Sequence, residues 1–188
     1  MDQPYSNQPA VNTDFSESDE IFVTNAGLVL VYPFLMRFFT KLQLLDEGQW
    51  VNDAAQERAV FLLQALVGIP ADEVAEFQLP LNKLICGLEL DAPVPANIEL
   101  TEDELNQAEG LLLAVLMNAP MMKTLTADGF RRAYLQREGM LSRVEDNWKL
   151  VVKRETYDVL IDRMPWSFNI LKLPWTETVI FVEWQTQP

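Results

Sequence analysis

The hydrophobic period of this chain changes near Gly139, and that change constrains its fold more than any other feature. Before this glycine, large apolar residues recur at spacings of three and four, as in Leu28, Val31 and Leu35, which is typical of helices. After it, apolar and polar residues alternate along 148–153, which is typical of a strand. The sequence therefore predicts an α+β fold: an N-terminal helical part of about five helices, then a small, mostly antiparallel β-sheet.

The predicted helical part spans 25–137. Its first helix lies in the apolar segment 25–45, with Thr24 or Asn25 as the N-cap and Pro33 either in the first turn or at a kink. The other predicted helices have their own start and stop signals: 54–66 between Asn52 or Asp53 and Gly68, 81–86 between Pro80 and Gly87, 102–118 after a capping box at Thr101 and Glu104, and 127–137 between Thr126 and Gly139. On the helix at 102–118, the residues expected to face the core are Leu105, Leu112, Val115 and Leu116.

The predicted β-rich part spans 140–184. Alternation predicts strands near 148–153, 168–173 and 178–184, whereas 157–161 fits either a strand or a helical turn. The first 20 residues are polar and acidic, which predicts a flexible acidic tail. The remainder, 21–188, is expected to form a single α+β domain.

Composition excludes several classes of chemistry. The chain has no histidine and one cysteine, so it has no Ser-His-Asp or Cys-His triad and no histidine-based or cysteine-rich zinc site. Its formal net charge of -14 argues against nucleic-acid binding and anionic membranes, and no segment is long and apolar enough to span a bilayer. Cys86 lies in an apolar run and is expected to be a small buried hydrophobe. We therefore expect no catalytic, cofactor-binding or metal-binding residues.

A near repeat places two tryptophans after prolines. Met164-Pro165-Trp166 and Leu173-Pro174-Trp175 lie nine residues apart, and each proline forces an extended or turn geometry. The favoured interpretation is a pair of corners whose indole rings close one end of the core. The alternative is a set of partner-binding anchors, for which the candidates are Trp166, Trp175 and Trp184.

Two charged groups are further candidates. Arg137 and Glu138 lie at a predicted helix end, where a solvated terminus is favoured over a fixed, partner-binding polar pair buried in an oligomer. Asp158 and Asp162 are four residues apart, and paired carboxylates perform acid–base catalysis in glycosidases. Such pairs are expected by chance in a chain with 28 acidic residues, so a carboxylate hydrolase is a minor alternative.

Several segments, taken in order, together resemble one known family. They are Ile21–Leu30 with Tyr32-Pro33-Phe34-Leu35, Leu81–Leu88 with Pro93-Val94-Pro95, Tyr134–Gly139 with Trp148-Lys149-Leu150, Asp158-Val159-Leu160, Met164-Pro165-Trp166, Ile170–Trp175 and Val182-Glu183-Trp184. The series, over about residues 21–184, is similar to the contractile injection system tape measure family of phage-tail-like particles.

This resemblance implies a non-enzymatic structural or assembly role in a bacterial contractile injection system. Its implied partners are tube and baseplate proteins, with self-association as a further expectation and no nucleic acid or membrane insertion. The implied location is the bacterial cytoplasm during assembly and then the assembled particle. The alternative is an adaptor or cargo-loading module of the same particle.

The resemblance departs from the family at the N-terminus. Family members often place this region behind a long variable part, whereas here about 20 polar residues precede it. A ruler needs many residues outside its globular part, since an α-helix rises only about 1.5 Å per residue. Either the chain is a fragment or it is a short member that acts as a baseplate-bound factor or plug.

Overall fold

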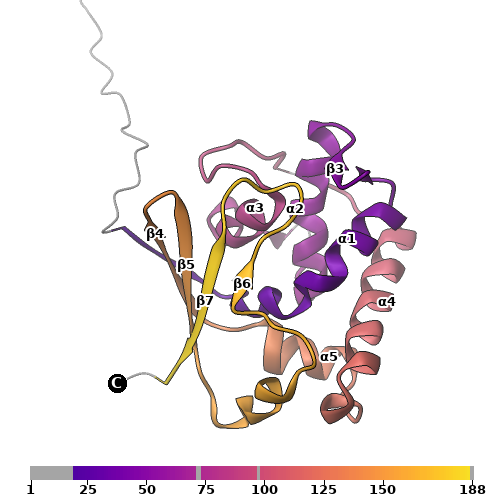
Figure 1. The fold of residues 1–188 in the computed structure, drawn as a ribbon. Helices are drawn as coiled ribbons and strands as arrows, with labels where there is room; N and C mark the ends of the chain where they lie inside the picture. Colours follow the sequence, from indigo (N-terminus) through magenta and orange to yellow (C-terminus); the bar gives the residue numbers. More distant parts are fainter. Residues whose placement is uncertain (1–18, 71–72, 97, 187–188) are drawn as a thin grey trace, which may run out of the picture.

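The computed structural model describes residues 19–70, 73–96 and 98–186 of the 188-residue chain. Within these residues, helices pack on one side of a five-stranded sheet, with the helical part first in sequence (Figure 1). The expected α+β fold is confirmed. The predicted tail at 1–20 lies outside the described residues except for Asp19 and Glu20, and Glu20 begins the first strand.

The sheet has the strand order β1-β4-β5-β7-β6. All neighbouring pairs are antiparallel except β5 and β7, which run parallel, so the expectation of a mostly antiparallel sheet is confirmed. The strands are β1 (Glu20–Val23), β4 (Gly139–Val144), β5 (Asn147–Lys153), β6 (Ile170–Leu171) and β7 (Ile180–Gln185). The strand predicted at 168–173 is therefore reduced to two residues, and 157–161 lies in a 3₁₀ helix, η6 (Thr156–Arg163).

The helical part begins with a 3₁₀ helix that is buried on every side. All six residues of η1 (Ala26–Val31) are buried, and Pro33 lies in the first turn of the following α1 (Tyr32–Lys41) rather than at a kink. Helix α1 ends earlier than the predicted segment because the chain then forms a hairpin, β2 (Leu45–Asp46) and β3 (Gln49–Trp50). Its two-residue turn at Glu47 and Gly48 has positive φ at both positions, a conformation that sheet twist favours in tight hairpins.

The remaining helices largely follow the predicted start and stop signals. They are α2 (Asp53–Val67), α3 (Pro80–Cys86), α4 (Glu102–Asn118) and α5 (Ala127–Phe130), with a π-helical turn η5 (Arg131–Leu135) and short 3₁₀ turns η3 (Glu76–Gln78) and η4 (Pro120–Met122). The caps at Asn52, Gly68, Gly87 and Thr101 are confirmed. Leu105 was expected to face the core, but it is 48% exposed on α4.

The helix predicted over 127–137, with Gly139 as its stop signal, ends at Leu135 instead. Gly139 is the first residue of β4, where it pairs with Val23 and Val152. A Cβ at this position would lie 2.7 Å from the Cβ of Ala26. The glycine is therefore required by close packing of η1 against the sheet, not by a helix terminus.

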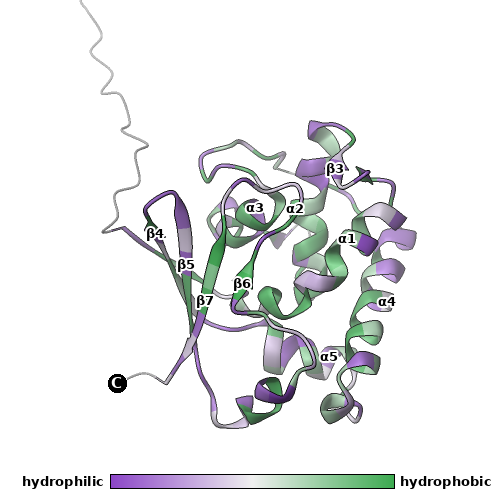
Figure 2. Cartoon of the chain, viewed as in Figure 1, coloured by the Kyte–Doolittle hydropathy of each residue, from purple (hydrophilic) through white to green (hydrophobic). Residues whose placement is uncertain are grey.

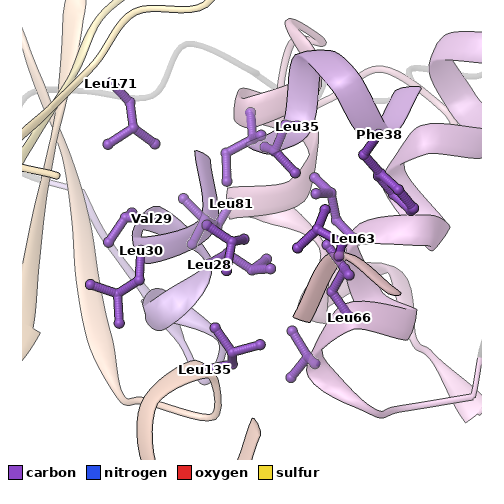
Figure 3. Packing of buried hydrophobic residues seen from close by; sticks show 14 of the residues in the cluster. Leu28, Val29, Leu30, Leu35, Phe38, Leu63, Leu66, Leu81, Leu135 and Leu171 are labelled. Carbon is purple, nitrogen blue, oxygen red and sulfur yellow. The ribbon is translucent and has the colours of Figure 1, made fainter. Parts of the chain in front are cut away.

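The core lies between the inner face of the sheet and the helices. Figure 2 shows hydrophobic residues concentrated on α2 and α3, and Figure 3 shows Leu28, Leu63 and Leu81 near the centre of this packing. Gly27 allows η1 to pack directly against the backbone of η5, since a Cβ at this position would lie 1.7 Å from the carbonyl oxygen of Tyr134. Close approach of η1 to η5 thus excludes any larger residue.

Three buried amides join the start of η1 to α2 and α3. Asn25 Nδ2 donates to Gln64 Oε1 (3.1 Å) and Asn82 Oδ1 (2.6 Å), and Asn82 Nδ2 donates to the carbonyl oxygen of Val60 (2.9 Å). Asn25 was a candidate N-cap, but its side chain makes no cap hydrogen bond and turns into the core. The three amides bond to one another, but Asn25 Oδ1 and Gln64 Nε2 are buried without a hydrogen-bond partner among the described residues, so the network is only partly satisfied.

Candidate functional site

Trp175 is a core residue. It is 7% exposed, and its Nε1 donates to the carbonyl oxygen of Ile85 at 2.9 Å. Its ring packs on Trp50 and Phe39, with centroid separations of 5.3 and 5.8 Å. The ring ties the loop before β7 to α3 and β3, so it closes one end of the core as the structural interpretation expects. It is not exposed for a partner in the folded chain.

Trp166 is half-buried and links η6 to the helical layer. Its Nε1 donates to the carbonyl oxygen of Leu30 at 2.9 Å, and its ring meets Phe34 edge-on at 5.2 Å. Pro165, just before it, is exposed. Trp166 thus has one edge fixed by η1 and α1, while another part of the side chain lies at the surface.

Trp184 lies near the end of β7, on the sheet face that packs against the core. It pairs in register with Val152, and its ring meets Phe168 edge-on at 6.0 Å. The Arg137 guanidinium lies 5.2 Å from the ring centroid, a cation–π distance. The indole Nε1 is buried and has no hydrogen-bond partner among the described residues. A buried donor of this kind is costly unless something accepts from it.

Trp166 and Trp184 line the same open groove. Its volume is about 780 Å³, and its floor includes Phe168 and Val182. Arg154 and Asp162 form an ion pair at its edge, and Asn169 lines it with an exposed side chain. Two of the three predicted tryptophans are therefore brought together, and we take this tryptophan groove as the candidate functional site.

Arg137 and Glu138, the candidate polar pair, do not contact each other but bind different partners. Arg137 is 4% exposed and makes a two-pronged contact with Asp158, with Nη1–Oδ1 and Nη2–Oδ2 distances of 2.7 Å. Glu138 is exposed, and its Oε2 lies 3.3 Å from Lys153 Nζ. The favoured expectation of a solvated helix end is therefore wrong for Arg137, because a buried carboxylate 21 residues away holds its side chain inside.

The Arg137–Asp158 pair forms the inner support of the groove. Arg137 also donates to the carbonyl oxygens of Lys153 (2.6 Å) and Ala133 (3.2 Å). Burial lowers the pKa of Arg137, but its hydrogen bonds to Asp158 outweigh burial, so the net shift of the pKa is upward. The guanidinium stays charged and holds η5, β5 and η6 together behind Trp184. Sequence spacing offered no signal for this pairing.

The arrangement of acidic residues does not support a carboxylate hydrolase. Asp158 is fully buried and accepts from Arg137 and from the Glu155 backbone N–H, whereas Asp162 is exposed and pairs with Arg154. Each carboxylate is thus neutralised by its own arginine. Among the residues that the structure describes, no three His, Cys, Asp or Glu side chains are grouped to hold a metal ion.

The structure also bears on the lone cysteine and on membrane-spanning helices. Cys86 is fully buried, as expected for a small hydrophobe, and burial raises the pKa of its thiol well above the usual value. None of the helices in the described ranges is long and apolar enough to cross a lipid bilayer.

A comparison with protein families decides the class of this chain. The family described as contractile injection system tape measure protein matches residues 2–184. This chain belongs to that family. No curated protein and no solved structure matches the chain. As a family member it is a structural component of a contractile injection system, and the family is not a known class of enzyme.

The tape measure resemblance rested on segments that the structure places mainly at packing junctions. Tyr134–Gly139 forms the passage from η5 to β4, and Leu173-Pro174-Trp175 closes the core beside α3. Met164-Pro165-Trp166 and Val182-Glu183-Trp184 instead both line the tryptophan groove. In this tape measure family member, the groove is thus built by two of the segments that carried the resemblance.

Proposed function

We propose that this tape measure family member is a non-enzymatic assembly protein that binds a tube or baseplate subunit through the tryptophan groove. The observation that carries the proposal is the groove itself, which has a volume of about 780 Å³ and is lined by Trp166 and Trp184. Tryptophans are enriched among the residues that dominate the energy of protein interfaces. A partner segment laid in the groove buries both rings.

The unpartnered indole N–H of Trp184 supports a specific polar contact. A backbone carbonyl of a partner would give this donor the acceptor that the described residues do not supply. Arg154, Asp162 and Asn169 at the edge provide polar groups that can meet the rim of the partner. We therefore assign binding to the groove and stability to Trp175, Arg137 and Asp158.

The dimensions of the described helices favour initiation of assembly over measurement of length. The longest of them, α4, has 17 residues and so spans about 25 Å at 1.5 Å per residue. The described residues pack around a common core rather than extending away from it. We place this part of the protein at the baseplate, where it would nucleate the tube in the cytoplasm and remain in the finished particle.

The proposal is tested by blocking the groove at its edge. Asn169→Arg adds a long cation to an exposed groove position whose backbone, not side chain, holds β7. The matched control is Asn106→Arg, also at an exposed position but on α4. Each variant is expressed with the other particle proteins, and particle yield, tube length by electron microscopy and co-purification of tube and baseplate subunits are measured.

We expect Asn169→Arg to lower particle yield and co-purification while Asn106→Arg leaves both unchanged. Equal behaviour of the two variants would contradict the groove as the binding site. If Asn169→Arg particles assemble normally but lack their cargo, the adaptor or cargo-loading role replaces assembly. A change of tube length at normal yield would instead support a role in setting length.

A further inference from the structure

The sheet has an open edge beside the tryptophan groove. Strand β7 has six residues, whereas β6 has two, which pair with Phe181 and Ile180, so β7 continues past the end of its neighbour (Figure 1). Asn169 extends the pairing by one hydrogen bond, in which the Val182 N–H donates to the Asn169 carbonyl oxygen at 2.8 Å. From Trp184 onward, no strand of the described structure pairs with this side of β7.

The strand register shows which backbone groups of β7 point to this edge. The backbone of a strand bonds alternately to its two neighbours. The carbonyl oxygen of Gln185 accepts at 2.8 Å from the N–H of Arg154, just after β5, and that of Val179, just before β7, accepts from β5 itself. Odd-numbered residues of β7 therefore bond toward β5. The even-numbered Val182 and Trp184 direct their backbone groups to the open side.

Four polar groups of Val182 and Trp184 have no partner in the described parts of the chain. They are the carbonyl oxygen of Val182, the N–H and the carbonyl oxygen of Trp184, and the buried indole Nε1 of Trp184. An unpaired strand edge is a template for pairing with another chain. An extended peptide supplies what these groups need, because its backbone offers N–H donors and carbonyl acceptors in alternation.

The groove limits the side chains that such a peptide carries. In a paired strand, the residue opposite Trp184 directs its side chain to the same face as Trp184. On this face Phe168 and Val182 form the apolar floor of the groove. Arg154 and Asp162 pair with each other at the groove edge, so these two side chains add no net charge there. The groove therefore favours a segment with an apolar residue opposite Trp184.

We propose that the partner subunit adds an extended segment to the sheet at the open edge of β7, with its backbone paired to Val182 and Trp184. This inference rests on the proposed function of the groove and names the chemistry of the partner. The partner contributes an extended strand with an apolar residue opposite Trp184, and one of its oxygens accepts from the indole N–H. Main-chain hydrogen bonds supply the affinity, and the apolar floor selects the side chain.

Amide hydrogen exchange followed by NMR tests the pairing on the full chain. In the free chain, we expect the unpaired Trp184 amide to exchange at least about tenfold faster than the Glu183 amide, which faces β5. Purified tube subunit and purified baseplate subunit of the same particle are then added separately. In the complex, we expect exchange of the Trp184 amide to slow by at least about tenfold, while the amides of β1 at the opposite edge stay unchanged.

Trp184→Phe tests the indole contact, because it removes the unpartnered donor and keeps an aromatic ring. We expect the melting temperature of the free chain to change little, and binding to the subunit to weaken about fivefold in isothermal titration calorimetry. Trp50→Phe is the matched control, since its indole donates to the Cys86 carbonyl oxygen at 3.0 Å and lies outside the groove lining. The control should lower the melting temperature and leave binding unchanged.

The outcomes separate this inference from the proposed function. If Asn169→Arg lowers co-purification but the Trp184 amide exchanges as fast in the complex as in the free chain, strand addition is overturned and the groove still binds its partner. A Trp184 amide that is already protected in the free chain also overturns strand addition, because the edge is then closed. If neither subunit forms a complex, the proposed function and this inference both fail.

Discussion

At the scale of single residues, the side chain with the most consequential surroundings is Arg137. It combines a two-pronged contact to a fully buried carboxylate with two backbone acceptors and two aromatic rings. A second Arg–Asp pair, Arg154 and Asp162, lies at the groove edge with the carboxylate half exposed. The two pairs have the same chemistry and differ mainly in burial, which decides how much each contributes to stability.

We predict that Arg137→Met lowers the free energy of unfolding by about 3–5 kcal/mol, because it leaves the Asp158 carboxylate buried without a counter-charge. Arg154→Met is the control and is expected to cost less than about 1 kcal/mol, since solvent screens that pair. Urea unfolding followed by circular dichroism measures both. Equal losses in the two variants would show that burial is not what distinguishes them.

At the scale of elements, hydrogen bonds at the start of α4 connect this helix to α2. Thr101 Oγ1 accepts from the Glu104 N–H (3.2 Å), and Glu104 Oε2 accepts from the Thr101 N–H (2.7 Å) and from Arg58 Nη2 of α2 (2.6 Å). Burial raises the pKa of Glu104, but the hydrogen bonds from Arg58 and Thr101 outweigh it, so the net pKa is lowered. The carboxylate therefore contributes to folding only while it is ionised.

Glu104→Gln is expected to cost about 1–2 kcal/mol of unfolding free energy at neutral pH, through loss of the charged bonds to Arg58. Because the folded-state pKa is below the unfolded value of about 4.3, the advantage of the wild type is full above that pH. It is lost as the pH falls through the folded-state pKa. Urea unfolding at pH 7 and near pH 3 should show the difference shrinking, and a constant difference would argue against the charge as its origin.

At the scale of the whole molecule, charge is unevenly divided between the two parts of the fold. Residues 1–130, which include the helices α1 to α5, carry 5 basic and 20 acidic side chains. Residues 131–188, which hold four of the five strands of the main sheet, carry 9 basic and 8 acidic side chains. The helical layer therefore repels itself and other copies, whereas the sheet side is nearly neutral.

We predict that raising NaCl from about 20 to about 150 mM increases the melting temperature by about 2–4 °C, close to ~1 kcal/mol for a chain of this size. Screening relieves repulsion among the excess acidic groups more than it weakens exposed ion pairs. Differential scanning calorimetry at low protein concentration keeps self-association from contributing. A melting temperature that falls with salt would show that attractive ion pairs outweigh the net repulsion.

The sequence predicts helix ends and strand alternation correctly where the cause lies within a few residues of the feature. The caps at Asn52, Gly87 and Thr101 and the alternation of Trp148, Leu150 and Val152 were predicted because their causes lie within a few residues. The change of period was therefore enough to indicate an α+β fold. The ordered series of segments was also enough to indicate the family.

Only the tertiary structure decided what those segments contact. Trp166 and Trp175 both follow a proline, yet Trp175 lies in the core and Trp166 lines a groove, because distant elements supply their neighbours. Arg137 finds Asp158 across 21 residues, and Gly139 opens a strand because η1 packs against it. The sequence gives the identity of each side chain. Its burial and its partners depend on which distant segments pack against it, and only the folded chain determines that packing.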